Sequence, residues 1–334
     1  MNISFILPTK TPTNHDLDPM KKILDKIYLQ GVNIFINKIN KNITHYFTWN
    51  VGKEMYYEAK KKYPNAVFIN LIWDIPQWRI DGKDDYGNPY DWSDYYLPFL
   101  KGADYLLSAS QSTKKIILDN FNIPSRVFYM FFDDQSILSK TKSIFDYLPN
   151  FFNSKNNFRI IGISRLVPSK KFDILIEAIG KLDQNIKNKI DLSIVGSGPE
   201  KKKLIQLSEK YQVKYKNYQN ISKSRLINLL KNSNLLIAPS VLEGDCGWAP
   251  CEAVFLDIPV IVTDMSVTKE FLKDGAIYFE KNNSVDLSKK IKKFFNNEIK
   301  KEIISKKAKE NLKFYTMNNF QLRLQNLINE IRSA

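Results

Sequence analysis

The sequence has few of the residues that cross-link a fold or bind metals. It contains 2 cysteines, Cys246 and Cys251, and 2 histidines, His15 and His45, among 334 residues. Both cysteines lie in one short segment, which excludes a disulfide framework and does not match the spacing of a zinc finger. We interpret them as small, partly buried residues. The histidines are expected in loops or on the surface and are not assigned as catalytic bases.

Long apolar runs are also absent. No stretch approaches the roughly 18 apolar residues that cross a membrane, and the apolar run at residues 3–7 is shorter than the roughly 7–15 residues of a signal-peptide core. We therefore expect a cytoplasmic protein. Its length exceeds that of a usual single domain, and 43% hydrophobic residues suffice for two cores.

Acidic residues are outnumbered by basic ones, 35 to 50, which gives a formal net charge of +15. Such a charge suits nucleic acid, an anionic membrane surface or an anionic substrate. No zinc-finger spacing, RNP-like aromatic pattern or compact arginine block accompanies it, so we expect no nucleic-acid partner. Peripheral contact with an anionic membrane stays open, because lysine-rich faces bind anionic lipids without a defined motif. Codon bias in an A/T-rich genome is the alternative source of the lysines.

Apolar runs alternate with helical periods in both halves of the chain. Strands are expected at residues 2–7, 32–36, 66–72, 105–109, 158–163, 192–195, 235–238 and 260–263. Helices are expected at residues 20–30, 53–62, 112–120, 172–182, 200–211, 223–231, 250–256, 298–314 and 318–331. A succession of strand, helix and strand predicts an α/β fold with parallel sheets covered on both faces.

The same patterns predict the domain organisation. Residues 1–150 and 151–315 are expected to form two Rossmann-like domains, and residues 316–334 a C-terminal helix that packs back toward the first. Residues 141–158 have the punctuation of an interdomain linker. Residues 77–96, which are polar and aromatic, are expected to form a long surface loop.

In open α/β sheets, ligands bind beyond the carboxyl ends of the strands. Arg165 and Lys170 follow the strand at 158–163, and cations beside the free amides of a helix suit a diphosphate leaving group. A solvated cationic helix start explains them equally well. Gly196 and Gly198 follow the next strand in a turn that allows close ligand approach, although a plain strand-to-helix turn needs no ligand. The turn lacks the third glycine of G-x-G-x-x-G, which disfavours a nicotinamide dehydrogenase.

A third loop, at residues 239–253, carries Glu243 and Glu252 on either side of a glycine-bearing turn that leads into a helix. One carboxylate can face a sugar, and the other can accept hydrogen bonds from ribose hydroxyls. The amides between them can meet hydroxyl or phosphate oxygens. This loop is the strongest indication of a binding site in the sequence.

The three loops, in this order, resemble the retaining GT-B glycosyltransferases of family 4, the group 1 glycosyl transferases, over residues 158–279. The resemblance implies two facing Rossmann-like domains with a cleft between them, the second binding the donor and the first choosing the acceptor. It implies that Arg165 and Lys170 hold the donor diphosphate and that Glu252 binds the nucleotide ribose. Glu243 would address the donor sugar or its phosphate. The other donor-binding residues that it implies are Gly196, Gly198, Tyr218 beside the base, Cys246, Gly247 and Trp248.

The chain departs from the family pattern at several positions. Eight residues separate Glu243 from Glu252, where the family has seven, and Lys171 and Asp257 stand where glycine is common. Residues 8–13 replace a glycine-rich loop. A family His-Asp pair is replaced here by Trp73 and Asp74, so no histidine role carries over. The acceptor-side candidates are Thr9, Lys10, Asp74, Tyr90 and Trp92, of which the last two are aromatic and suited to stacking on sugar rings.

These observations together predict a retaining transfer of a hexose from a UDP- or GDP-linked sugar to a hydroxyl of a carbohydrate or lipid-linked acceptor. The nucleotide sugar is a co-substrate, and no cofactor or metal is expected; Asp16 and Asp18 form a D-x-D pattern, but acidic residues are favoured near a helix start in any case. The alternatives are a GT-B-type sugar-nucleotide epimerase or phosphorylase, and a catalytically idle protein that binds nucleotide or glycan.

Overall fold

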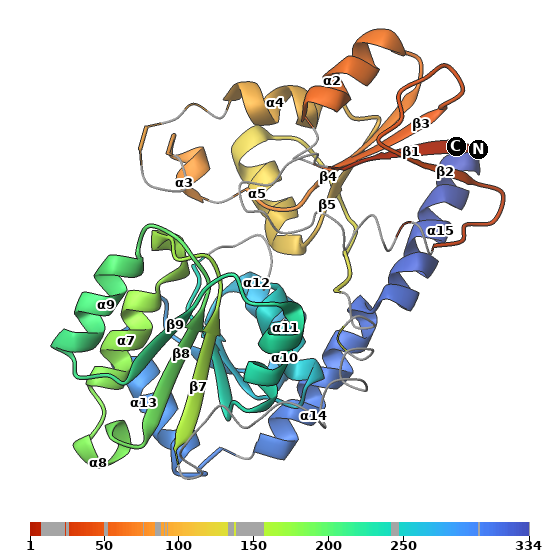
Figure 1. The fold of residues 1–334 in the computed structure, drawn as a ribbon. Coiled ribbons are helices and arrows are strands. Elements are labelled where there is room, and N and C mark those ends of the chain that lie inside the picture. Colours follow the sequence, from red (N-terminus) through yellow and green to blue (C-terminus); the bar gives the residue numbers. More distant parts are fainter. Residues whose placement is uncertain are drawn as a thin grey trace. The chain divides into compact units, whose positions relative to one another are not determined.

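The computed structural model describes residues 1–7, 24, 27–49, 53–75, 77–83, 88–89, 91, 93–132, 137, 157–241, 247–299 and 301–333. The chain divides into two compact units. The first comprises Met1–Phe131 and Tyr315–Ala334, and the second comprises Phe132–Leu242 and Cys246–Phe314. Each unit is built around one parallel six-stranded sheet (Figure 1). The α/β prediction is therefore confirmed.

The first sheet has the strand order β2-β1-β3-β4-β5-β6. Its strands are β1 (Asn2–Ile6), β2 (Asn33–Ile36), β3 (His45–Trp49), β4 (Val67–Ile72), β5 (Tyr105–Ser108) and β6 (Arg126–Val127). Its helices are α2 (Lys53–Lys62), α3 (Gln77–Ile80), α4 (Ser93–Lys101), α5 (Gln111–Phe121) and α15 (Met317–Ser333). Ser110 caps α5, since its hydroxyl accepts the Thr113 N–H at 3.0 Å.

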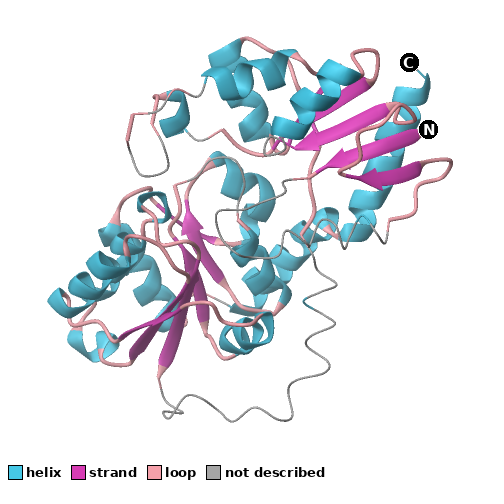
Figure 2. Cartoon of the chain, turned by 45° about the horizontal axis from the view of Figure 1, so that its top comes forward, coloured by secondary structure: helices cyan, strands magenta, loops and turns pink. Residues whose placement is uncertain are grey.

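The second sheet has the order β12-β11-β10-β7-β8-β9. Its strands are β7 (Phe158–Ile163), β8 (Ile190–Val195), β9 (Tyr215–Tyr218), β10 (Leu235–Ala238), β11 (Val260–Thr263) and β12 (Ile277–Phe279). Its helical elements are η1 (Pro168–Lys170), α7 (Phe172–Gly180), α8 (Gln184–Lys187), α9 (Lys201–Lys210), α10 (Lys223–Lys231), α11 (Trp248–Phe255), α12 (Ser266–Leu272), η2 (Lys273–Gly275), α13 (Ser284–Phe295), α14 (Lys301–Leu312) and η3 (Lys313–Tyr315). Figure 2 shows helices on both faces of each sheet.

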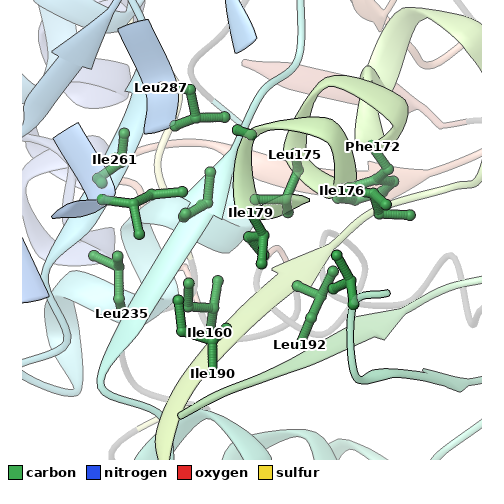
Figure 3. Packing of buried hydrophobic residues seen from close by; sticks show 14 of the residues in the cluster. Ile160, Phe172, Leu175, Ile176, Ile179, Ile190, Leu192, Leu235, Ile261 and Leu287 are labelled. Carbon is green, nitrogen blue, oxygen red and sulfur yellow. The ribbon is translucent and has the colours of Figure 1, made fainter. Parts of the chain in front are cut away.

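Burial of apolar residues on both sheet faces holds each unit together. In the second unit, Phe172, Leu175, Ile176 and Ile179 of α7 turn toward the strands and pack in one cluster with residues such as Ile160 (Figure 3). These four residues recur at helical spacing, which is why the segment folds as a helix with one buried face. The buried face of α7 fixes the position of the loop that precedes it.

Some sequence predictions need correction. Residues 77–96 do not form one long loop, because they contain α3 and the start of α4. Tyr96, Phe99 and Leu100 recur at helical spacing on α4 and are buried, so packing stabilises a helix despite Pro98. The predicted helix at residues 20–30 lies largely outside the described residues, and its end at 27–30 is not helical. Of the predicted linker at 141–158, only Asn157 and Phe158 are described.

Candidate active site

The strand order β10-β7-β8-β9 brings four strand ends together. All four strands are parallel, so their carboxyl ends meet at one edge of the second sheet, and the loops that follow them are neighbours. These loops carry the residues that the sequence singles out in the second half of the chain. The hydrogen bonds between the loops show how closely they are joined.

The loop after β7 and the turn after β8 are joined by their backbones. The Leu166 N–H donates to the Ser197 carbonyl at 2.8 Å, and the Glu200 N–H donates to the Leu166 carbonyl at 3.0 Å. A Cβ added to Gly196 would lie 1.8 Å from the Ser164 carbonyl oxygen, and Gly196 has a φ of +153°. Glycine is therefore required for this close approach. The turn fixes the backbone on both sides of Arg165, whose side chain is exposed.

Lys170 ends the short helix η1 and extends toward the loop after β10. Its Nζ lies 3.5 Å from the Ser240 hydroxyl, and the Val241 N–H donates to the Ser169 carbonyl at 3.0 Å. The next residue, Lys171, has a φ of +52° and links η1 to α7. This left-handed conformation is the physical reason why glycine would suit the position. Asp257, the other departure from a common glycine, also has a positive φ, +60°.

Helix α11 carries Glu252, the predicted ribose-binding residue. Gly247 precedes the helix with a φ of +77°, and Trp248 is its first residue. The Glu252 side chain is 13% exposed and forms an ion pair with Lys223, which is 30% exposed and begins α10. Lys223 belongs to none of the three loops that the sequence motifs identify. Only its place at the start of a predicted helix could have drawn attention to it.

Tyr218 ends β9 and contacts both the Gly196 turn and α10. Its carbonyl accepts the Gly196 N–H at 2.8 Å. The Arg225 guanidinium lies 5.8 Å from the centroid of its ring, within the range of a cation–π contact. One residue earlier in the strand, the Asn217 side-chain amide donates to the Gly196 carbonyl at 3.0 Å. Asn217 and Arg225, like Lys223, were missed from the sequence.

The remaining predicted residues fall into two groups. Asp74 follows β4 in the first unit, where the carbonyl of its neighbour Trp73 accepts the Thr113 hydroxyl at 3.1 Å. The others lie outside the described residues, namely Thr9, Lys10, Tyr90, Trp92, Glu243 and Cys246. The predicted site residues that the structure describes in the second unit are Arg165, Lys170, Gly196, Gly198, Tyr218, Gly247, Trp248 and Glu252.

This edge of the sheet combines cations with a carboxylate that is mostly buried. Arg165, Lys170, Lys223 and Arg225 supply positive charge, which suits the phosphates of a nucleotide. Glu252 supplies acceptors for hydroxyl groups. Among the described residues, no group of three or more histidine, cysteine or acidic side chains could hold a metal ion. In the same part of the chain, no helix has the length and apolarity needed to cross a membrane.

Known proteins are similar to this chain in sequence and in structure. Residues 147–311 match the model of the family described as glycosyl transferases group 1. A glycosyltransferase of Methanocaldococcus jannaschii, MJ1178, is 27% identical over 225 residues, which cover 63% of this chain and 58% of that protein. A poly(ribitol-phosphate) alpha-N-acetylglucosaminyltransferase of Staphylococcus aureus is 28% identical over 46% of this chain and 32% of its own. The matched part thus spans less than two thirds of either relative.

Solved structures match over more of the chain. Anabaena Alr3699/HepE in complex with UDP aligns with a TM-score of 0.72 at 16% identity, over 99% of this chain and 100% of that one. Sucrose-phosphate synthase of Thermosynechococcus elongatus aligns with a TM-score of 0.76 at 11% identity, over 99% of both chains. At these identities the likeness shows the fold, which is GT-B. The family match and the fold agree with the order of the loops: residues 147–311 match the glycosyl transferases group 1 family, and the chain has the GT-B fold of such enzymes.

Proposed function

We propose that this protein transfers a hexose from a UDP- or GDP-linked sugar to a hydroxyl acceptor, with retention of the anomeric configuration. The observation that carries the proposal is the joining of four strand-following loops at one sheet edge. Backbone hydrogen bonds place Arg165 beside the Gly196 turn, and side-chain contacts link Lys170 to Ser240 and Glu252 to Lys223. A nucleoside diphosphate presents the phosphates and ribose hydroxyls that these groups would bind.

The proposed roles of Arg165 and Lys170 follow from the negative charge that develops on the leaving group. As the bond between the anomeric carbon and the phosphate oxygen breaks, negative charge grows on the diphosphate. Arg165 and Lys170 stabilise that charge, which is the electrostatic contribution that lowers a transfer barrier most. The acceptor oxygen bonds to the anomeric carbon on the face that the phosphate leaves, and the departing phosphate takes the acceptor proton. This route needs no histidine base.

The classes of donor and acceptor are proposed by analogy with two similar proteins. UDP in the complex with HepE supports a uridine donor by analogy. The staphylococcal relative, named for poly(ribitol-phosphate), supports a hydroxyl of a carbohydrate or lipid-linked polymer as acceptor. The first unit is assigned to the acceptor, with Asp74, Tyr90, Trp92, Thr9 and Lys10 as candidates.

A panel of UDP-, GDP- and ADP-sugars tests the proposal. We expect slow release of nucleoside diphosphate without acceptor and faster release with glycan or lipid-linked acceptors. Formation of an epimer of the donor would instead identify an epimerase, and phosphorolysis with free phosphate a phosphorylase. Binding of nucleotide without any turnover across the panel would identify an idle binding protein and contradict the proposal.

A further inference from the structure

The first turn of α10 contacts two residues of the proposed donor site. Lys223 forms an ion pair with Glu252, and Arg225 lies over the ring of Tyr218. Ser222 caps the helix, because its hydroxyl accepts the Arg225 N–H at 3.3 Å. The cap fixes the backbone from which the Lys223 side chain extends. This turn lies outside the loops that carry the family resemblance.

Glu252 needs its ion-pair partner because its carboxylate is mostly buried. The Glu252 side chain is 13% exposed, and a carboxylate at that depth loses hydration that only a close partner replaces. Lys223 provides the partner through its contact with Oε1. A carboxylate has about four lone-pair positions, and one ammonium group does not occupy them all. Glu252 can therefore keep Lys223 as a partner while it accepts hydrogen bonds from ribose.

We infer that Lys223 is a positioning residue that holds the Glu252 carboxylate in the orientation in which both ribose hydroxyls can donate to it. The inference rests on the proposed nucleotide-sugar function. It makes selection of ribose over deoxyribose depend on α10, and it assigns the two cations of one turn to different parts of the nucleotide. Lys223 serves the ribose through Glu252, and Arg225 serves the base through Tyr218.

Calorimetry tests this assignment with UDP or GDP, whichever binds, and with the 2′,3′-dideoxy form of the same nucleotide. The wild type should prefer the ribonucleotide by about tenfold or more, since a hydrogen bond to a charged group contributes about 1.5–3 kcal/mol. Lys223→Met should remove most of that preference by weakening ribonucleotide binding, while dideoxynucleotide binding stays unchanged. Lys223→Arg should restore it. The double variant Lys223→Met with Glu252→Gln should bind no more weakly than the weaker single variant.

Lys202→Met serves as the control, because Lys202 is exposed on α9, and it should bind both nucleotides as the wild type does. Thermal unfolding of each variant verifies that it is folded. The inference is wrong if Lys223→Met binds the ribonucleotide as well as or better than the wild type, or if it weakens both nucleotides equally. In those cases, lost discrimination in Glu252→Gln would leave the donor site intact and reject only the role of Lys223. Full discrimination in Glu252→Gln would contradict the donor site itself.

Discussion

At the scale of single residues, variants of the neighbouring Lys170 and Lys171 can distinguish a specific diphosphate site from a general cationic patch. Arg165→Ala or Lys170→Ala should lower kcat by about a hundredfold to a thousandfold, or about 3–4 kcal/mol, because each removes charge that acts in the transition state. Lys171→Ala should lower kcat by less than about tenfold, since its ammonium group is not part of the proposed diphosphate site. Steady-state rates of the three variants measure this. Equal losses at Lys170 and Lys171 would indicate an undirected patch, and loss at Lys171 alone would shift the assigned position by one.

A residue can be proposed for the site from the sequence where a motif contains it, but not where only a tertiary contact brings it to the site. Glu252 and Arg165 stand out because they follow buried strands beside glycine or at a helix start. Lys223 does not, because its partner is 29 positions away and the contact exists only once α10 and α11 pack on the sheet. The geometry explains why glycine would suit position 171, since the backbone of Lys171 is left-handed.

At the scale of elements, substitution of Gly196, in the turn after β8, should destabilise the protein more than substitution of Gly247, before α11. Gly196→Ala combines positive-φ strain with a Cβ that collides with the Ser164 backbone, and should lower the free energy of unfolding by at least about 2 kcal/mol. Gly247→Ala has only the strain, because the nearest atom to its Cβ is Pro250 Cδ at 3.7 Å, and should cost about 1–2 kcal/mol. Denaturant unfolding measures both.

The same comparison extends to ligand binding. Gly196→Ala should also weaken nucleoside diphosphate binding, since it displaces the backbone on both sides of Arg165. A Gly196→Ala protein as stable as Gly247→Ala would show that the turn and the Arg165 loop are not in contact in solution.

Strands with mostly apolar residues were predictable, and short or polar strands were not. Strands β7, β10 and β11 have the predicted bounds because most of the residues in each are apolar. Strands β9 and β12 are short edge strands, and β9, with its sequence Tyr-Lys-Asn-Tyr, has no apolar run to reveal it. Helix α13 was also missed, although its buried face, which includes Leu287 and Ile291, has helical spacing.

At the scale of the whole molecule, the first unit depends on the end of the chain. Phe320 of α15 is fully buried, with its ring centroid 4.6 Å from that of Phe131 and 5.8 Å from that of Phe128. Arg323 on the same helix donates to the Tyr129 and Met130 carbonyls, and burial lowers its pKa to about 10. These contacts join residues that lie about 190 positions apart.

Phe320→Ala should therefore destabilise the first unit by about 3–5 kcal/mol through lost burial and a cavity. Leu322→Ala is the control, because Leu322 is 60% exposed on the same helix and its truncation should change stability by less than about 0.5 kcal/mol. Hydrogen exchange measured separately in each unit reports the free energy of unfolding of both variants. Equal stability of the two variants would mean that α15 does not complete the first core.

Hydrogen–deuterium exchange with and without UDP or GDP tests the central claim, that the carboxyl edge of the second sheet binds the nucleotide of the donor. Bound nucleotide should slow exchange in residues 164–171, 196–200, 218–225 and 247–252, because the loops that carry Arg165, Gly196, Lys223 and Glu252 become ordered around it. Glu252→Ala should reduce the slowing at the same nucleotide concentration. Unchanged exchange in all four segments, under conditions in which the protein releases nucleoside diphosphate from its donor, would place the donor elsewhere and contradict the account.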